Sequence, residues 1–187
     1  MSDKYSRILE ITYQLIAQHG IEKTSMSLIA KEMGVTKPAI YYYFSSKEKL
    51  VRTLFEVLVT EIQFTKFFQI EKYSKENFCD QLIMDGIRMI QEQGADPYYE
   101  NVMRQYSVLA ARENKYQVIL EEVLYDFLQG FTTLLQRAHQ FGLLPDEEIA
   151  IRAQYLTLVV DGLDQYTDER YGFDAEAIWK FTVQNFF

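Results

Sequence analysis

Residues that interrupt helices are scarce in this chain, and this scarcity restricts its fold more than any other feature. Its 187 residues include only 3 prolines and 8 glycines, so long uninterrupted helices are possible. Between these breaks apolar residues recur at steps of three and four, the period of a helix with one buried face. Apolar residues make up 48% of the chain, enough for a substantial core. The pattern predicts an all-α protein of about nine helices.

The first four helices are expected close together, within roughly the first 65 residues. Helices are predicted over 4–19, ended by Gly20, and over 26–33, opened by Thr24 or Ser25. Thr36 is expected to cap a third helix with Pro38 in its first turn. Ser45 and Glu48 have the spacing of a capping box that opens the fourth.

Longer helices are expected in the rest of the chain. The predicted ranges are 76–93, 98–111, 114–141, 146–166 (capped by Asp146) and 174–185 (capped by Asp174). The sequence shows no internal repeat and no low-complexity tract. It therefore predicts a small N-terminal group of short helices followed by a larger helical region.

Three residues in the N-terminal group have the spacing of a helix-turn-helix. Ala30 is small enough for two helices to cross, Gly34 tolerates a positive φ in the turn, and Ile40 can point back to the core. This arrangement presents the start of the second helix outward, in the way that such helices enter a major groove.

The same placement assigns the aromatic run that follows. Phe44, four residues after Ile40, is expected in the core, and Tyr42 is expected to pack partly between helices. Tyr41 and Tyr43 are expected on outer faces, where a phenol can donate to a phosphate oxygen. The alternative is that the whole run only packs between helices.

Further candidates for DNA contact surround this run. Lys37 could bind guanine or phosphate, and the Ala39 methyl could meet a thymine methyl. Lys47, at the start of the fourth helix, could bind phosphate. The net charge of −8 looks unsuited to DNA, but residues 1–50 carry a net +2 and residues 51–187 a net −10. Since salt screens charges beyond about 10 Å, the local charge decides the approach.

The string GIEKTSMSLIAKEMGVTKPAIYYYFSSKEKL, residues 20–50, resembles the DNA-binding domain of the tetracycline-repressor (TetR) family of transcriptional regulators. The resemblance implies a DNA-binding domain over 1–47 and a larger helical ligand-binding and dimerisation domain over 48–187. It implies DNA contacts from Ser25, Met26, Ser27, Lys37, Pro38, Ala39, Tyr41, Tyr43 and Lys47. Many relatives have a histidine at the position of Tyr43 and an acidic residue at that of Leu28, so the operator sequence cannot be read from this chain.

The helix predicted over 146–166 carries two apolar stripes. One consists of Ile149, Ala153, Leu156, Val160 and Leu163, and the other of Ile151, Tyr155, Leu158 and Gly162. Two stripes fit a helix that packs in its own subunit and against a partner, as the family's dimer implies. The first stripe, with Ile178 and Phe181 of the last helix, is the predicted homodimer interface. The alternative is a helix buried within one subunit.

The central region is rich in large apolar side chains that could line a cavity for a small-molecule effector. The candidates are Phe64, Phe67, Phe68, Met84, Met103, Tyr106, Tyr125 and Phe127. The alternative is that they only fill the core. The fourth helix would be the lever, because its Lys47 end meets the DNA-binding domain while its far end leads to the phenylalanines.

Other functional classes find little support. His19 and His139 lack metal-ligand spacing, and neither a GxSxG motif nor a glycine-rich phosphate loop is present, so we expect neither an enzyme nor a cofactor. A helical adaptor would not need the helix-turn-helix residues. The single cysteine, Cys79, and the lack of a membrane-spanning stretch predict a cytoplasmic protein. The sequence thus predicts a ligand-responsive repressor that binds a palindromic operator as a homodimer.

Overall fold

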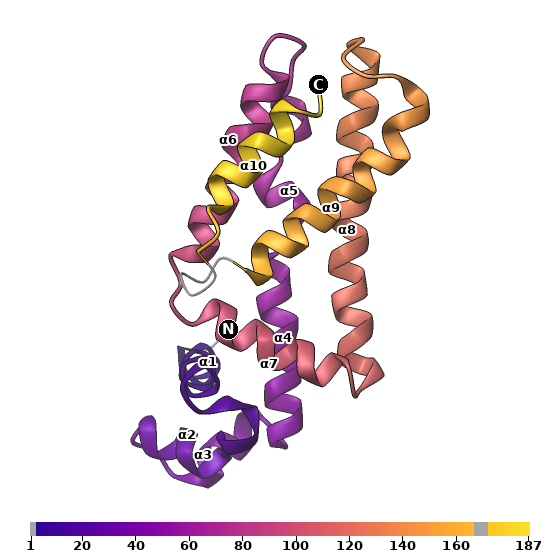
Figure 1. The fold of residues 1–187 in the computed structure, drawn as a ribbon. Coiled ribbons are helices and arrows are strands. Elements are labelled where there is room, and N and C mark those ends of the chain that lie inside the picture. Colours follow the sequence, from indigo (N-terminus) through magenta and orange to yellow (C-terminus); the bar gives the residue numbers. More distant parts are fainter. Residues whose placement is uncertain (1–2, 167–171) are drawn as a thin grey trace. The chain divides into compact units, whose positions relative to one another are not determined.

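The computed structural model describes residues 3–166 and 172–187, and every regular element in these ranges is a helix (Figure 1). The elements are α1 (Asp3–Lys23), α2 (Met26–Glu32), α3 (Lys37–Tyr43), α4 (Lys47–Glu61), α5 (Phe64–Phe67), the 3₁₀ helix η1 (Ile70–Lys72), α6 (Phe78–Gly94), α7 (Tyr99–Ala110), α8 (Asn114–Gln140), the 3₁₀ helix η2 (Asp146–Glu148), α9 (Ile149–Gln165) and α10 (Ala175–Gln184). The predicted all-α class is confirmed. Within these ranges no helix is both long and apolar enough to span a membrane.

Two of the predicted caps form side-chain hydrogen bonds, whereas Thr36 occupies the N-cap position of α3 without one. The predicted cap at Asp146 is wrong, because Asp146 lies in η2 and the N-cap of α9 is Glu148. Ser25 accepts a hydrogen bond from the N–H of Leu28 at the start of α2, and Asp174 accepts one from Ala177 at the start of α10. Gly20 has a φ of +79° and interrupts the regular geometry of α1 near its end.

The predicted capping box at Ser45 is wrong. Helix α4 begins one residue later than that box requires, and Ser46 Oγ accepts the hydrogen bond from the N–H of Lys49 at 3.0 Å. Glu48 forms an ion pair with Lys115 instead of reaching back to the cap. Helix α5 is not among the predicted helices, because its four residues are too few to show a helical period.

The chain divides into two compact units. Unit 1 comprises the described residues up to Glu61 together with 97–120, and unit 2 comprises 62–96 and the described part of 121–187. The predicted functional boundary at residue 47 stays a prediction, since it concerns which part binds DNA.

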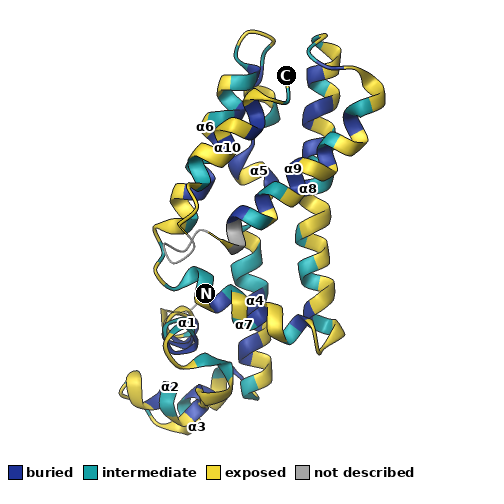
Figure 2. Cartoon of the chain, in the orientation of Figure 1, coloured by how far each residue is buried: buried dark blue, intermediate teal, exposed yellow. Residues whose placement is uncertain are grey.

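The core of unit 1 joins α1, α2, α3, α4 and α7, which Figure 2 shows buried on their inner sides. Ile29, Ile40 and Leu50 are fully buried. Phe55 of α4 stacks on Tyr106 of α7 with ring centroids 4.1 Å apart. The Tyr106 hydroxyl donates to the Val51 carbonyl at 2.7 Å, so α7 is held to α4 by both a ring contact and a hydrogen bond.

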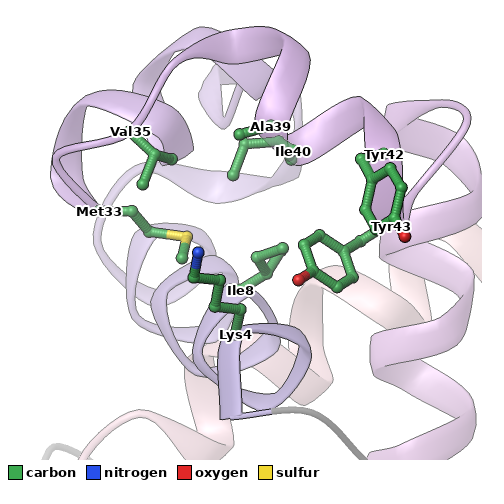
Figure 3. Close-up of a pocket in the computed structure, with 8 residues that line it drawn as sticks. All are labelled: Lys4, Ile8, Met33, Val35, Ala39, Ile40, Tyr42 and Tyr43. Atoms are coloured by element: carbon green, nitrogen blue, oxygen red, sulfur yellow. The ribbon is translucent and has the colours of Figure 1, made fainter.

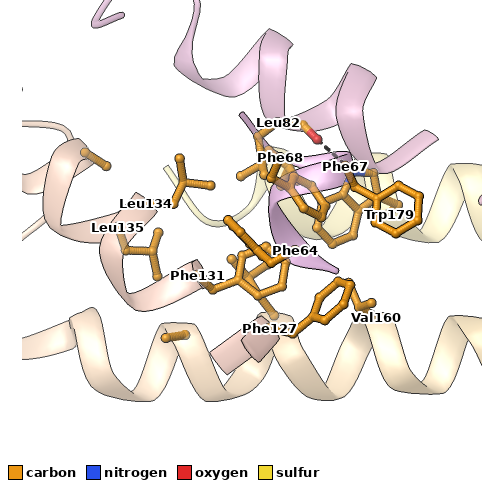
Figure 4. Packing of buried hydrophobic residues seen from close by; sticks show 14 of the residues in the cluster. Phe64, Phe67, Phe68, Leu82, Phe127, Phe131, Leu134, Leu135, Val160 and Trp179 are labelled. Atoms are coloured by element: carbon orange, nitrogen blue, oxygen red, sulfur yellow. Dashed lines mark hydrogen bonds between the residues drawn. The ribbon is translucent and has the colours of Figure 1, made fainter. Parts of the chain in front are cut away.

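The core of unit 2 is a cluster of aromatic rings (Figure 4). Phe64 of α5 lies 5.0 Å from both Phe68 and Phe131, measured between ring centroids. Gly130 of α8 permits this contact, because a Cβ there would stand 2.1 Å from the Phe64 ring. Trp179 of α10 is fully buried, and its indole N–H donates to a carbonyl of α6. These close contacts pack α5 and α10 into unit 2.

Candidate nucleic-acid interface

The turn between α2 and α3 has the geometry that the sequence predicts. Ala30 and Ile40 are buried, and Gly34 adopts a φ of +66°, where a side chain would be strained. The N–H of Gly34 donates to the Lys31 carbonyl at 3.1 Å, and that of Val35 donates to the Ala30 carbonyl at 2.9 Å. These bonds close the turn and set the direction of α3.

The inner face of α3 is anchored on α1. Ile40 is fully buried, and Phe44, which follows the helix, is 2% exposed and stacks on Tyr5 of α1 with ring centroids 4.9 Å apart. The core roles predicted for Ile40 and Phe44 are confirmed. Because the inner face is held in this way, the residues opposite Ile40 face outward.

The outer face of α3 carries two phenols. Tyr41 is 43% exposed, and the Lys37 ammonium lies 5.7 Å from the centre of its ring. Tyr42 is 84% exposed, so the expectation that it packs between helices is wrong. The helical period explains the difference, since two residues beyond Ile40 is about 200° around the helix, almost opposite the core. Sequence reasoning could have found Tyr42 from this angle alone.

The remaining residues predicted to contact DNA differ in solvent exposure. Ser27, Lys37 and Pro38 are exposed, Ala39 and Tyr43 are partly exposed, and Ser25 is exposed while its hydroxyl caps α2. Met26 is 4% exposed and belongs to the core of unit 1. Its side chain is therefore not available to DNA in this structure.

Lys47 lies at the start of α4, and its ammonium has an intramolecular partner. Its Nζ donates to the Glu22 carbonyl near the end of α1 at 2.9 Å. Partial burial lowers the pKa of this lysine, and the nearby Glu22 carboxylate opposes the shift. The side chain thus links α4 to α1, and its predicted phosphate contact stays a prediction.

The predicted dimer residues are divided by their burial. The first stripe of α9 faces the core of unit 2 and consists of the buried Ile149, Ala153, Leu156, Val160 and Leu163. In the second stripe, Leu158 is 66% exposed and Ile151 and Tyr155 are also exposed. On α10, Ile178 is exposed and Phe181 is 69% exposed. The stripe of α9 that was predicted to form the dimer interface is therefore buried within its own unit, and the exposed apolar residues of α9 belong to the second stripe.

The predicted ligand residues fall in both units. Met103 and Tyr106 belong to unit 1, and Phe64, Phe67, Phe68, Met84, Tyr125 and Phe127 belong to unit 2. Tyr106 and the four phenylalanines are buried in their cores, whereas Met84 and Tyr125 are exposed. The structure therefore does not bring these eight residues together within one unit.

Comparison with known proteins agrees with this architecture. Residues 8–54 match the sequence profile of the bacterial regulatory proteins of the tetR family. The uncharacterized HTH-type transcriptional regulator YfiR of Bacillus subtilis is 27% identical over 174 residues, which cover 89% of this chain and 82% of YfiR.

Two solved structures share the fold over nearly the whole chain. One is a complex of SmeT with triclosan, with a TM-score of 0.77 and 18% identity, covering 98% of this chain and 90% of SmeT. The other is a transcriptional regulator from Saccharomonospora viridis in complex with choline, with a TM-score of 0.76 and 18% identity. It covers 100% of this chain and 96% of its own.

Proposed function

Because the chain is a TetR-family helix-turn-helix transcriptional regulator, we propose that it is a repressor whose α3 enters the major groove of a near-palindromic operator. This is a family of regulators, not of enzymes. The observation that carries the proposal is the outer face of α3. An 84%-exposed Tyr42 and a Lys37 beside Tyr41 have no role in the core, and phenol and ammonium groups are suited to phosphate and base edges.

The experiment first selects a duplex of about 30 base pairs, three turns of DNA, from a random pool with the full chain. Lys37→Ala, Tyr41→Phe and Tyr42→Ala are then titrated against that duplex at several salt concentrations. Loss of one base or phosphate contact should weaken binding by about 1–3 kcal/mol per subunit. Loss of a lysine–phosphate contact should also reduce the salt slope by about one per subunit, and thus by about two where two subunits bind a near-palindromic operator. Selection of no duplex, or three folded variants with unchanged affinity, would overturn the proposal.

We further propose that the protein acts as a homodimer through the exposed faces of α9 and α10. Ile151, Tyr155 and Leu158 on α9 and Ile178 and Phe181 on α10 are large apolar side chains left in water. Exposed apolar surface of this kind is typical of an interface. A dimer would present two copies of α3 about one DNA turn apart, roughly 34–36 Å, which requires a near-palindromic operator.

Two substitutions on α9, two residues apart, distinguish an interface position from a core position. Leu158→Glu places a charge on the exposed stripe and should give a folded monomer, since the unpaired carboxylate opposes burial in the interface. Leu156→Glu places the same charge in the core, where Leu156 is fully buried, and should unfold unit 2. Light scattering and circular dichroism distinguish the two. A monomeric unmutated protein at micromolar concentration would refute the dimer.

We also propose that a small, largely apolar effector releases the DNA. Proteins of the same fold have been solved with triclosan and with choline, which supports a ligand-responsive role. The aromatic cluster around α5 is the proposed binding region. Since only two residues connect α4 to α5, a shift of α5 would be transmitted along the chain.

A compound screen by thermal shift, followed by DNA titrations with each hit, tests the effector. A hundredfold loss of DNA affinity requires the ligand to discriminate between the two states by about 2.7 kcal/mol. A compound that strongly stabilises the protein but leaves DNA affinity unchanged would show that its site is not coupled to DNA binding.

A further inference from the structure

We propose that a pocket on one flank of α3 receives a sugar–phosphate unit of the operator backbone, and that Lys4 of α1 contacts its phosphate. The inference rests on the proposed placement of α3 in the major groove. Lys4 lies on α1, outside the helix-turn-helix itself, and is not among the DNA contacts predicted from the sequence.

The pocket lies within unit 1, between α1, the α2–α3 turn and α3 (Figure 3). Its volume is about 180 Å³. The residues that line it are Lys4, Ile8, Met33, Val35, Ala39, Ile40, Tyr42 and Tyr43. Figure 3 shows the Lys4 side chain extending from α1 toward the α2–α3 turn, and the Tyr43 hydroxyl pointing toward α1.

The chemistry of the lining suits a sugar–phosphate unit. Lys4 is exposed and carries the only charge among the lining residues, none of which is acidic. The phenols of Tyr42 and Tyr43 can donate hydrogen bonds to phosphate oxygens. The other five lining residues are apolar and suit the carbon face of a deoxyribose. A sugar–phosphate unit has an apolar face and an anionic group, which match the apolar residues and the lysine of the pocket.

The helical period places this pocket beside the DNA-reading face. Ala39 and Tyr43 are four residues apart and therefore lie on one flank of α3, the flank that lines the pocket. Lys37 and Tyr41 are also four residues apart and lie on the opposite flank, where the ammonium approaches the ring.

A helix in the major groove has a phosphate backbone on each side. The groove is about 12 Å wide, close to the diameter of a helix with its side chains, so both flanks approach phosphates. Lys37 lies on the same flank as Tyr41 and supplies a positive charge to the phosphates on that side. On the pocket flank α3 has no cation, and Lys4 of α1 supplies one. The two lysines would thus neutralise opposite backbones.

The test compares Lys4→Ala, Lys4→Arg and Lys75→Ala on the selected duplex, with Lys37→Ala as the reference for the proposed function. Lys75 is an exposed lysine of unit 2, so its loss changes the net charge equally without touching the pocket. Lys4→Ala should reduce affinity roughly 5- to 20-fold at low salt and lower the salt slope by about two, about one for each subunit of the proposed dimer. Lys4→Arg should keep the affinity and the salt slope of the unmutated protein, and Lys75→Ala should change neither quantity.

The outcomes distinguish the inference from the proposed function. Weakened binding by Lys37→Ala together with full affinity and an unchanged salt slope for Lys4→Ala would overturn the pocket contact and leave the proposed function in place. An equal loss from Lys75→Ala would show a net-charge effect and also overturn it. Because Lys4 is exposed, all variants should keep the melting temperature of the unmutated protein, which is the check on folding.

Discussion

Helices α3 and α5 are both short and rich in aromatic residues, yet their rings have opposite surroundings. Tyr41 and Tyr42 of α3 are exposed in unit 1, whereas Phe64 and Phe67 of α5 are buried in unit 2. Moving a phenyl ring out of water lowers the free energy. A phenol can stay in water at a smaller cost because its hydroxyl is solvated. The comparison shows that an aromatic run can form either an exposed face or a core. The hydroxyl permits exposure but does not decide it, since Tyr106 is fully buried and Phe181 is 69% exposed.

The largest expected effect is on the α5 side of this comparison. Phe64→Ala removes a ring that packs against Phe68, Phe127 and Phe131 and should destabilise unit 2 by about 3–5 kcal/mol. Urea unfolding followed by the fluorescence of Trp179, the single tryptophan, measures it. Tyr125→Ala, an exposed ring in the same unit, is the matched control. A loss below about 1 kcal/mol for Phe64→Ala would break the comparison.

The close approach of Gly130 to Phe64 gives the second prediction. Gly130→Ala should destabilise by about 1–3 kcal/mol despite the better helix propensity of alanine, because its Cβ would stand 2.1 Å from the ring. In a Phe64→Ala background the same change should be neutral or stabilising, because the obstructing ring is gone.

Gly94→Ala, in α6, is the control for Gly130. A Cβ at Gly94 meets no atom within 4 Å, so this variant should keep or gain stability. If Gly130→Ala costs the same with and without the Phe64 ring, the packing of α5 on α8 is not the cause.

Tyr106 extends the comparison to a buried phenol in unit 1. Tyr106→Phe removes the hydrogen bond to the Val51 carbonyl and should cost about 0.5–1.5 kcal/mol at neutral pH. Burial raises the pKa of Tyr106 above its ordinary value. The unfolded tyrosine therefore ionises first as pH rises past about 10, and the stability that depends on the neutral phenol declines by up to about 1.4 kcal/mol per pH unit.

Unfolding at pH 7, 9 and 11 measures this dependence. The difference between the unmutated protein and Tyr106→Phe should be constant up to about pH 9 and shrink above about pH 10. A difference that stays constant at high pH would contradict a buried, neutral phenol.

The smallest expected change in stability is at Tyr42. Tyr42→Ala should change the free energy of unfolding by less than about 0.5 kcal/mol, because the ring is 84% exposed. The same variant should weaken DNA binding, as proposed above. A large loss of stability would place this ring in the core after all and remove the contrast between α3 and α5.

Much of unit 1 could be predicted from the sequence because its signals are local. Ser25, Gly34 and Ile40 act within a few residues of their positions, through a cap, a positive φ and a helical face. The same local reasoning misplaced the cap of α4 by one residue, since Ser45 and Ser46 are chemically identical candidates. It also misjudged Tyr42, where the helical angle should have outweighed the expectation of packing.

The sequence by itself determined the all-α class, the helix-turn-helix and the two apolar stripes of α9, because helical period and turn chemistry depend on neighbours in the chain. The tertiary structure decided which stripe is buried, that the side chain of Met26 is in the core, and that Lys4 stands beside α3. Each of these depends on residues that are distant in the chain. A periodic pattern shows that a face is apolar, but only the packed neighbours show whether that face is covered.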